Sequence, residues 1–299
     1  MTAASRPARG DARLPGGVRL HFRDEGRGDC VVLLHGGMGD CDSWEPQFAV
    51  LRPRFRVISY SRRDSHPNTN GPSGNTHMLE RDVEDLRDFL RCLSVDCCHL
   101  VGTSYGALVA LGFGLHNAIA VRSLVLCEPP LHAWARHTPL GTSLYNTFML
   151  ETWLPARASF EQGDPTTALE LLSAGMSGAP VFHAWSQERR RAALRNGRAM
   201  QALTASTDPF PDLPRQQIAA IKAPLLLLSG ANTGPLHRVV MEELARSMPA
   251  APWITIPDAG HGVSAENPAA FTAALVTFFR GSLSPCDPPD AGGRLSCRT

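Results

Sequence analysis

The sequence predicts an α/β fold, in which a doubly wound, mostly parallel sheet carries an inserted helical lid. Short apolar runs alternate with helical patterns along most of the chain, as they do where parallel strands are joined by helices. This alternation stops between residues 130 and 221, where helical patterns and aromatic residues replace the strands. We therefore expect one sheet with one large insertion.

Seven apolar runs have the length and composition of buried strands. They are VRLHFRDEG (18–26), VVLLHG (31–36), FRVISYS (55–61), CCHLVGTS (97–104), VRSLVLCE (121–128), APLLLLSG (223–230) and APWITIPD (251–258). Helices are expected near 43–52, 77–92, 105–116, 236–248 and 266–280. In the second of these, leucine and valine recur at steps of four, three and four from Leu79 to Leu90, which places one apolar stripe against a sheet.

The insertion is rich in helical pieces, such as TALELLSAG and SQERRRAALRNGRAMQALTA, and in aromatic residues. The aromatic residues are Trp134, Tyr145, Phe148, Trp153, Phe160, Phe182 and Trp185. We expect a core of residues 14–129 and 222–281 and a helical lid of residues 130–221. Residues 1–13 and 282–299 are rich in proline, glycine and serine, and we expect flexible tails there.

The composition gives little reason to expect a macromolecular partner. The 29 lysines and arginines nearly balance 28 acidic residues, so the net charge of +1 offers no electrostatic argument for nucleic acid. No apolar stretch approaches the ~18 residues of a membrane span, and the N-terminal residues lack the apolar segment of a secretory signal. We expect a cytoplasmic protein that acts on a small molecule, with no nucleic-acid or membrane partner.

The eight cysteines form no C-x-x-C pair, and several lie inside strand-like runs. This placement favours buried free thiols over a disulfide or zinc framework. We expect neither a metal nor a cofactor.

One serine stands between two glycines, directly after an apolar run and before an alanine-rich helical pattern, in Gly102-Thr103-Ser104-Tyr105-Gly106. Glycines at this spacing allow a strained turn that presents the serine above the edge of a sheet. Ser104 is then a candidate nucleophile, and the alternative is a turn with a structural role only. A serine nucleophile needs a base within reach. His261 is the candidate, because it follows the last strand-like run, although a loop histidine can also be structural.

These segments resemble the α/β-hydrolase superfamily from about Val18 to Phe279. The resemblance is carried by His35-Gly36-Gly37-Met38, by Trp44, by the serine pentapeptide and by Gly260-His261. It implies an oxyanion hole made by the backbone N–H of Tyr105 and that of Gly37, with Met38 as the other choice for the second donor. We also expect Met38 to touch the substrate.

The third member of the implied triad departs from the common family pattern. Many relatives place an aspartate in a G-x-x-D stretch after the lid, where this chain has Gly230-Ala231-Asn232-Thr233. Glu128 ends the strand before the lid, where some haloalkane dehalogenases and cofactor-free dioxygenases carry their acid. A carboxylate at that strand end points into the crevice where ligands bind. We expect Glu128 to support His261; a surface role for Glu128 or another acid are the alternatives, and Asp258 is expected to pin the loop.

The segment ISYSRRDSHPN (58–68) replaces the family's Asp-x-x-G turn with Arg62-Arg63-Asp64 and Pro67. These arginines could meet an anionic group of the substrate. We favour salt bridges over the sheet edge.

The resemblance implies a serine hydrolase that cleaves an ester or related acyl bond of a small, largely apolar molecule through an acyl-enzyme. A serine at the turn, rather than an aspartate, argues against dehalogenase or epoxide hydrolase chemistry. Trp134 and Trp185 of the lid are expected to bind the substrate. The alternatives are a cofactor-independent dioxygenase on the same fold and a small-molecule receptor.

Overall fold

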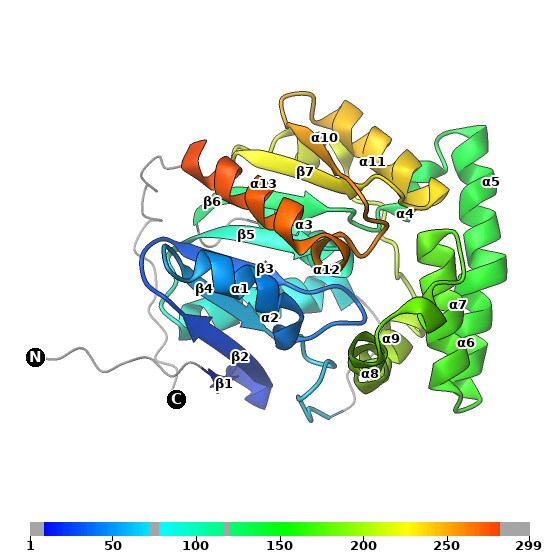
Figure 1. Cartoon of the computed structure of the whole chain (residues 1–299), viewed down its shortest axis with the longest axis horizontal. Helices are drawn as coiled ribbons and strands as arrows, with labels where there is room; N and C mark the ends of the chain where they lie inside the picture. Colours follow the sequence, from blue (N-terminus) through cyan, green and yellow to red (C-terminus); the bar gives the residue numbers. More distant parts are fainter. Residues whose placement is uncertain (1–8, 72–77, 117–119, 282–299) are drawn as a thin grey trace, which may run out of the picture.

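A single twisted sheet organises the computed structural model, which describes residues 9–71, 78–116 and 120–281 (Figure 1). Its strands are β1 (Arg9–Arg13), β2 (Arg19–Glu25), β3 (Cys30–Leu34), β4 (Arg56–Tyr60), β5 (Cys97–Thr103), β6 (Ala120–Cys127), β7 (Leu225–Gly230) and β8 (Trp253–Ile256). Their order in the sheet is β1-β2-β4-β3-β5-β6-β7-β8. The pairs β1–β2 and β2–β4 are antiparallel, and every other pair is parallel. The mostly parallel sheet is thus confirmed.

Helices cover both faces of the sheet. They are α1 (Glu45–Leu51), α2 (Met78–Cys92), α3 (Tyr105–His116), α11 (Pro235–Ser247), α12 (Val263–Glu266) and α13 (Pro268–Gly281). In Figure 1, α1 and α13 lie in front of the sheet. The buried apolar residues of α2, α3 and α11 belong to the apolar cluster on the opposite face. This arrangement is the expected doubly wound fold.

The strands carry apolar side chains on both faces because both faces are covered. In β3, Val31 and Leu33 pack in the cluster that contains Phe271 of α13, while Val32 and Leu34 pack in the cluster on the other face. Each of these four side chains is 1% exposed or less. Burial of one such side chain stabilises the folded protein by about 1.5–3 kcal/mol. The central strands that carry the site at their ends are therefore stably packed on both faces.

The inserted lid is helical, as predicted, and Figure 1 shows α5 to α9 gathered beyond one end of the sheet. Its helices are α4 (His132–Ala135), α5 (Pro139–Phe148), α6 (Leu154–Glu161), α7 (Pro165–Ser177), α8 (Gln187–Arg195), α9 (Gly197–Thr204) and α10 (Arg215–Ala219). Side chains of Thr138, Asp164 and Ser186 accept hydrogen bonds from backbone N–H groups at the starts of α5, α7 and α8. No strand lies in the fully described segment between β6 and β7.

The expectation of a flexible tail over residues 1–13 is wrong for Arg9–Arg13. These residues form β1, in which Ala12 pairs with Leu20 of β2. Ala12 is the strand's one buried residue. Because an edge strand of this kind is mostly polar, its sequence lacks the apolar run that marks the other strands. Residues 1–8 and the expected tail at 282–299 lie outside the described residues.

The cysteines follow the expectation in part. Cys41, Cys98 and Cys127 are buried free thiols, whereas Cys97 is disulfide-bonded, contrary to the prediction of free thiols. Within the described ranges, no group of three or more histidine, cysteine, aspartate or glutamate side chains is placed to hold a metal ion. A search of the same ranges finds no helix with the length and apolarity that a membrane crossing requires.

Candidate active site

A strained turn between β5 and α3 presents Ser104. The serine has a φ of 52°, a left-handed conformation that costs an L-residue about 1–2 kcal/mol. Gly102 and Gly106 make the turn possible by their lack of side chains. A Cβ on Gly102 would lie 2.4 Å from the Gly106 carbonyl oxygen, and a Cβ on Gly106 would lie 2.2 Å from that of Leu34. The two glycines predicted to be necessary for the turn therefore permit close backbone packing around the serine.

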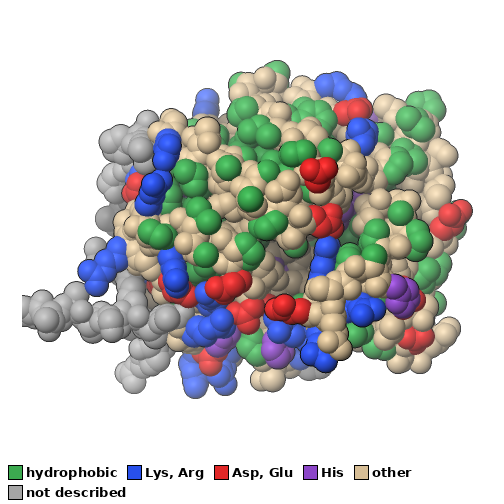
Figure 2. Space-filling model, in the orientation of Figure 1, with side chains coloured by type: hydrophobic (Ala, Val, Ile, Leu, Met, Phe, Trp, Pro, Cys, Tyr) green, Lys and Arg blue, Asp and Glu red, His purple; other side chains and the backbone are tan. Residues whose placement is uncertain are grey.

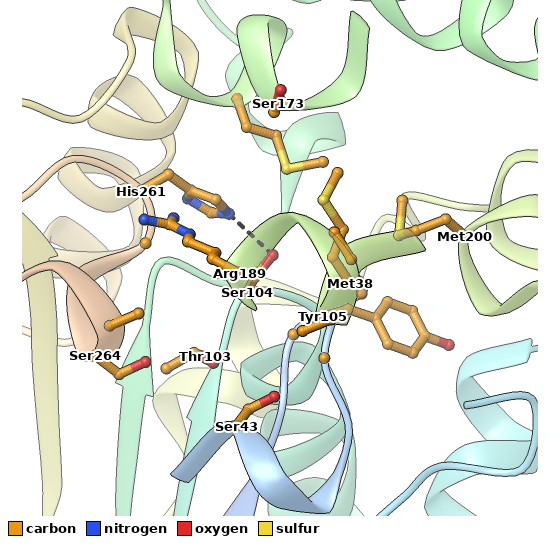
Figure 3. A pocket seen from close by; sticks show the side chains of 18 of the residues that line it. Met38, Ser43, Thr103, Ser104, Tyr105, Ser173, Arg189, Met200, His261 and Ser264 are labelled. Carbon is orange, nitrogen blue, oxygen red and sulfur yellow. Dashed lines mark hydrogen bonds between the residues drawn. The ribbon is translucent and has the colours of Figure 1, made fainter. Parts of the chain in front are cut away.

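Three side chains from three separate strand ends meet at this turn. The Oγ of Ser104 lies 3.0 Å from Nε2 of His261, and Nδ1 of the same ring lies 2.6 Å from Oε2 of Glu128. Figure 3 shows the first of these contacts as a dashed line. The side chain of Glu128 is fully buried and that of His261 is 10% exposed. A carboxylate at Nδ1 places the N–H on that nitrogen and leaves the Nε2 lone pair for the serine hydroxyl.

The Glu128 carboxylate is held by two further donors. Its Oε1 accepts a hydrogen bond of 2.9 Å from the Gly230 N–H, and its Oε2 accepts one of 2.8 Å from the Thr233 hydroxyl. The backbone of Glu128 is itself strained, with a φ of 49°. Thr233, which stands where many relatives are expected to carry the acid, therefore contributes a hydrogen-bond donor to the carboxylate. Asp258 lies exposed in the histidine loop with a φ of 52°.

The loop after β3 has its backbone oriented by a buried network. The Gly36 carbonyl oxygen accepts hydrogen bonds from Nδ1 of His35 at 2.8 Å, from Nη2 of Arg62 at 3.1 Å and from the N–H of Gly39 at 3.1 Å. Burial lowers the pKa of His35 to about 3, so the ring is neutral and its Nε2 accepts from the Arg62 N–H. Because a trans peptide points its C=O and N–H in opposite directions, fixing this carbonyl also fixes the N–H of Gly37.

Tyr105 begins α3, where the first N–H groups of a helix have no acceptor inside the helix. The positive end of the helix dipole favours negative charge at this point. The side chain of Tyr105 is buried, and the Arg62 guanidinium stacks 4.5 Å from the centre of its ring. Gly37 and Tyr105, the two residues expected to form the oxyanion hole, therefore both border the cavity that contains Ser104.

A cavity of about 960 Å³ opens over Ser104 between the sheet edge and the lid. Apolar side chains supply much of its wall, and they are Met38, Phe148, Trp153, Met176, Trp185, Met200, Leu203 and Phe210. Charged side chains also line it, among them Arg9, Asp42, Glu188, Arg189, Arg191 and Arg195. Figure 2 shows Lys/Arg and Asp/Glu side chains close together on the face of the molecule seen in Figure 1. A space of this volume suits a small molecule.

Two buried histidines form part of the cavity wall next to His261. The ring of His237 lies 4.1 Å from that of His261, and the ring of His132 lies 5.1 Å from that of His237 and 4.4 Å from that of Phe210. Burial, with a smaller contribution from His261, lowers the pKa of His132 to about 3 and that of His237 well below its usual value. Both rings are therefore neutral near pH 7 and extend the aromatic wall.

The structure separates the other residues predicted for the site into two groups. Met38 and Trp185 line the cavity, but Trp134 does not, so the expectation that Trp134 binds substrate is wrong. Trp134 is fully buried, its indole N–H donates to the Leu213 carbonyl oxygen at 3.0 Å, and Arg215 stacks on its ring. In the four-residue helix α4, His132 borders the cavity, whereas Trp134 packs into the apolar cluster that the lid shares with one face of the sheet.

Arg62 and Arg63 form ion pairs, the role favoured from the sequence over contact with an anionic substrate group. Arg63 makes a bidentate pair with Asp85, and Arg62 lies 3.6 Å from Asp82. Neither arginine lines the cavity. Sequence reasoning missed the role of Arg62 at the Gly36 carbonyl, and it missed His132 and His237. No local pattern marks these contacts, because each joins elements far apart in the chain.

Comparisons with known proteins agree with this fold. Residues 31–275 match the model of the alpha/beta hydrolase family. A putative carbamate hydrolase, RutD, of Pantoea ananatis is 24% identical over 258 residues, which cover 86% of this chain and 90% of that protein. An esterase of Thermogutta terrifontis superposes with a TM-score of 0.71 at 22% identity, over 93% of this chain and 100% of that one. Carboxylesterase CesB of Bacillus subtilis superposes with a TM-score of 0.66 at 18% identity, over 94% and 93%. The match to the family model covers most of the chain, and the protein is therefore a hydrolase of the alpha/beta hydrolase family.

Proposed function

We propose that the protein is a serine hydrolase that cleaves an ester or related acyl bond of a small, largely apolar molecule through an acyl-enzyme. The observation that carries this proposal is the continuous path of contacts from Ser104 through His261 to Glu128, at 3.0 Å and 2.6 Å, beside a cavity. A serine, a base and an acid that orients the base are the parts that acyl transfer requires.

In the proposed reaction, Oγ of Ser104 attacks the substrate carbonyl carbon while its proton passes to Nε2 of His261. The imidazolium then carries a positive charge against the Glu128 carboxylate. Collapse of the tetrahedral intermediate breaks the bond to the leaving group, which takes the proton from Nε2. Water repeats the sequence on the acyl-enzyme, with His261 as its base, and releases the acid and the free serine.

The negative charge that develops on the carbonyl oxygen needs donors that are already in place. We assign the N–H groups of Gly37 and Tyr105 to this task, because the first is oriented through the Gly36 carbonyl and the second opens α3. Removing one such donor typically costs about 2.7–4 kcal/mol of barrier in a serine hydrolase. Arg62 supports the site through the Gly36 carbonyl, without lining the cavity.

The cavity supports the choice of substrate class. Aromatic and methionine side chains surround much of the space near Ser104, and the charged residues that line the cavity include both signs. The names of the similar proteins, which are an esterase, a carboxylesterase and a putative carbamate hydrolase, all refer to carbonyl groups bonded to a heteroatom leaving group. Met38 and Trp185 are proposed substrate contacts on this basis.

A fluorophosphonate probe and a short-chain p-nitrophenyl ester test the proposal together. Wild type should gain one phosphonyl group on the peptide that contains Ser104 and should release p-nitrophenol with repeated turnover. Ser104→Ala should lose both while keeping its fold, whereas Ser264→Ala, which changes another serine of the same cavity, should still be labelled. Labelling of Ser104→Ala at a different serine would overturn the assignment.

Oxygen uptake without ester turnover would instead support the oxygenase alternative, and a single burst of product without turnover would support a receptor.

A further inference from the structure

The lid helix α8 lies between two carboxylates of the core. Arg189 is near its start and Arg195 is its last residue, so the two are separated by about 9 Å along the helix axis. Both arginines line the cavity, and each pairs with a carboxylate close to a loop of the candidate active site: Arg189 with Glu266 at the end of α12, and Arg195 with Asp40. The lid therefore contacts both sides of the site through charged groups.

The Arg195 end of α8 is joined to the loop that carries Gly37. Arg195 donates to both oxygens of Asp40, at 2.7 Å and 3.0 Å, and the side chain of Asn196 donates to the same carboxylate at 2.8 Å. Asp40 is 1% exposed and caps the turn that follows this loop. A bidentate ion pair with a buried carboxylate requires a specific geometry, so these contacts fix the Arg195 end of α8 against the loop that carries Gly37.

The Arg189 end of α8 is joined to the loop that carries His261. Nη2 of Arg189 donates to Oε1 of Glu266 at 2.8 Å, and Oε2 of the same carboxylate accepts the Gly260 N–H at 2.7 Å. Gly260 directly precedes His261 in the chain. One carboxylate therefore connects the lid arginine to the backbone beside the candidate base, and Figure 3 shows Arg189 and His261 next to each other.

Packing holds the arginine in this place. Its guanidinium stacks on the ring of Trp185, 4.1 Å from the ring centre. A Cβ on Gly262 would lie 2.4 Å from Nη2 of Arg189 and 2.5 Å from Oε1 of Glu266. The absence of a side chain on the residue after His261 thus lets the ion pair lie directly over the loop.

We propose that Arg189 is a positioning residue for His261, acting through Glu266 and the Gly260 N–H, so that the seating of the lid and the placement of the base are coupled. This inference rests on the proposed function. Without the arginine, the Glu266 carboxylate loses the cation that holds one of its oxygens, and the Gly260 N–H is then bound to a less restrained acceptor next to His261. A displacement of about 1 Å at such a position can cost up to about a hundredfold in rate, so a small loosening is measurable.

The test compares Arg189→Gln, Glu266→Gln and the double variant by steady-state ester hydrolysis, with Arg190→Gln as the control. Arg190 is a neighbour on the same helix with the same charge, and it does not line the cavity. The Arg189–Glu266 pair is about one quarter exposed, so each single variant should lower kcat by about fivefold with KM changed less than twofold. The double variant should lose no more than the worse single variant, because both remove one connection. Arg189→Lys should restore part of kcat relative to Arg189→Gln, since it keeps the charge but not the planar group that stacks on Trp185.

Three results would overturn the inference. Single variants with the kcat of wild type would show that the connection does not position the base. Additive losses in the double variant would show that the two residues act separately. A rise in KM for Arg189→Gln alone, with Glu266→Gln unchanged, would make the arginine a substrate contact, because Glu266 does not line the cavity. A wild type without ester turnover would instead refute the proposed function, and circular dichroism with thermal unfolding verifies that each variant is folded.

Discussion

Glu128→Gln is the sharpest test of the proposed mechanism, because it removes a charge and nearly preserves the shape. The carboxylate is fully buried and lies 2.6 Å from Nδ1 of His261. With the two charge centres about 4 Å apart and an effective dielectric constant of about 20, the carboxylate stabilises the imidazolium by about 4 kcal/mol. That energy corresponds to about 10³ in rate. An amide also allows the wrong imidazole tautomer, which costs about 10⁴ in a serine protease triad.

We therefore expect Glu128→Gln to lower kcat for a p-nitrophenyl ester by about 10³ to 10⁴. KM should change little, because Glu128 does not line the cavity. Thr233→Ala removes one of the three donors to the carboxylate and should cost about fivefold, the value of one hydrogen bond of about 1 kcal/mol. Adding Thr233→Asp to Glu128→Gln should recover at least about tenfold of kcat, because Oγ1 of Thr233 lies 2.8 Å from the Glu128 Oε2 and a carboxylate at position 233 would lie close to the same place.

Asp258→Asn is the matched control for this experiment. It changes a carboxylate to an amide in the histidine loop at a φ of 52°, a conformation that asparagine tolerates. This variant should keep kcat within about fivefold of wild type, since a lost exposed charge interaction is worth about 0–1 kcal/mol. Activity of Glu128→Gln within tenfold of wild type would refute the reasoning, as would an equal loss in Asp258→Asn.

The remaining predictions concern His132, Trp134 and Trp185. The pKa of His132 is about 3 in the folded protein, below its ordinary value of 6.5. As pH falls from 6.5 toward 3, the unfolded chain binds a proton at this histidine and the folded protein does not. The free energy of unfolding therefore decreases in that range. Between pH 7 and 5 this group should cost about 2 kcal/mol, and urea unfolding of His132→Phe should show a correspondingly weaker pH dependence. Equal pH dependence in the two proteins would contradict this prediction. Trp134→Ala should lower the free energy of unfolding by about 3–5 kcal/mol, because the side chain is fully buried. Trp185→Ala should instead raise KM with a smaller loss of stability. A raised KM in Trp134→Ala, with KM unchanged in Trp185→Ala, would contradict this prediction and indicate that Trp134 contacts the substrate.

The sequence alone determined the architecture and the nucleophile candidate, because both leave local patterns. Buried parallel strands read as short apolar runs, and the strained turn at Ser104 shows as two glycines that admit no Cβ. Strand β1 was not predicted from the sequence. It lies at the edge of the sheet and buries only one of its residues, so its sequence contains no apolar run. The helical insert could be predicted as well, because the short apolar runs typical of buried strands are missing from that segment.

The tertiary structure alone decided which further side chains join the predicted serine, histidine and glutamate. Glu128 and Thr233 are separated by 105 residues, and only the pairing of β6 with β7 brings the hydroxyl to the carboxylate. Trp134 and His132 lie two residues apart in one short helix, yet the first is packed into the lid and the second faces the cavity. Local periodicity cannot distinguish them, because the direction of a side chain on a single helical turn depends on what the rest of the chain packs against it.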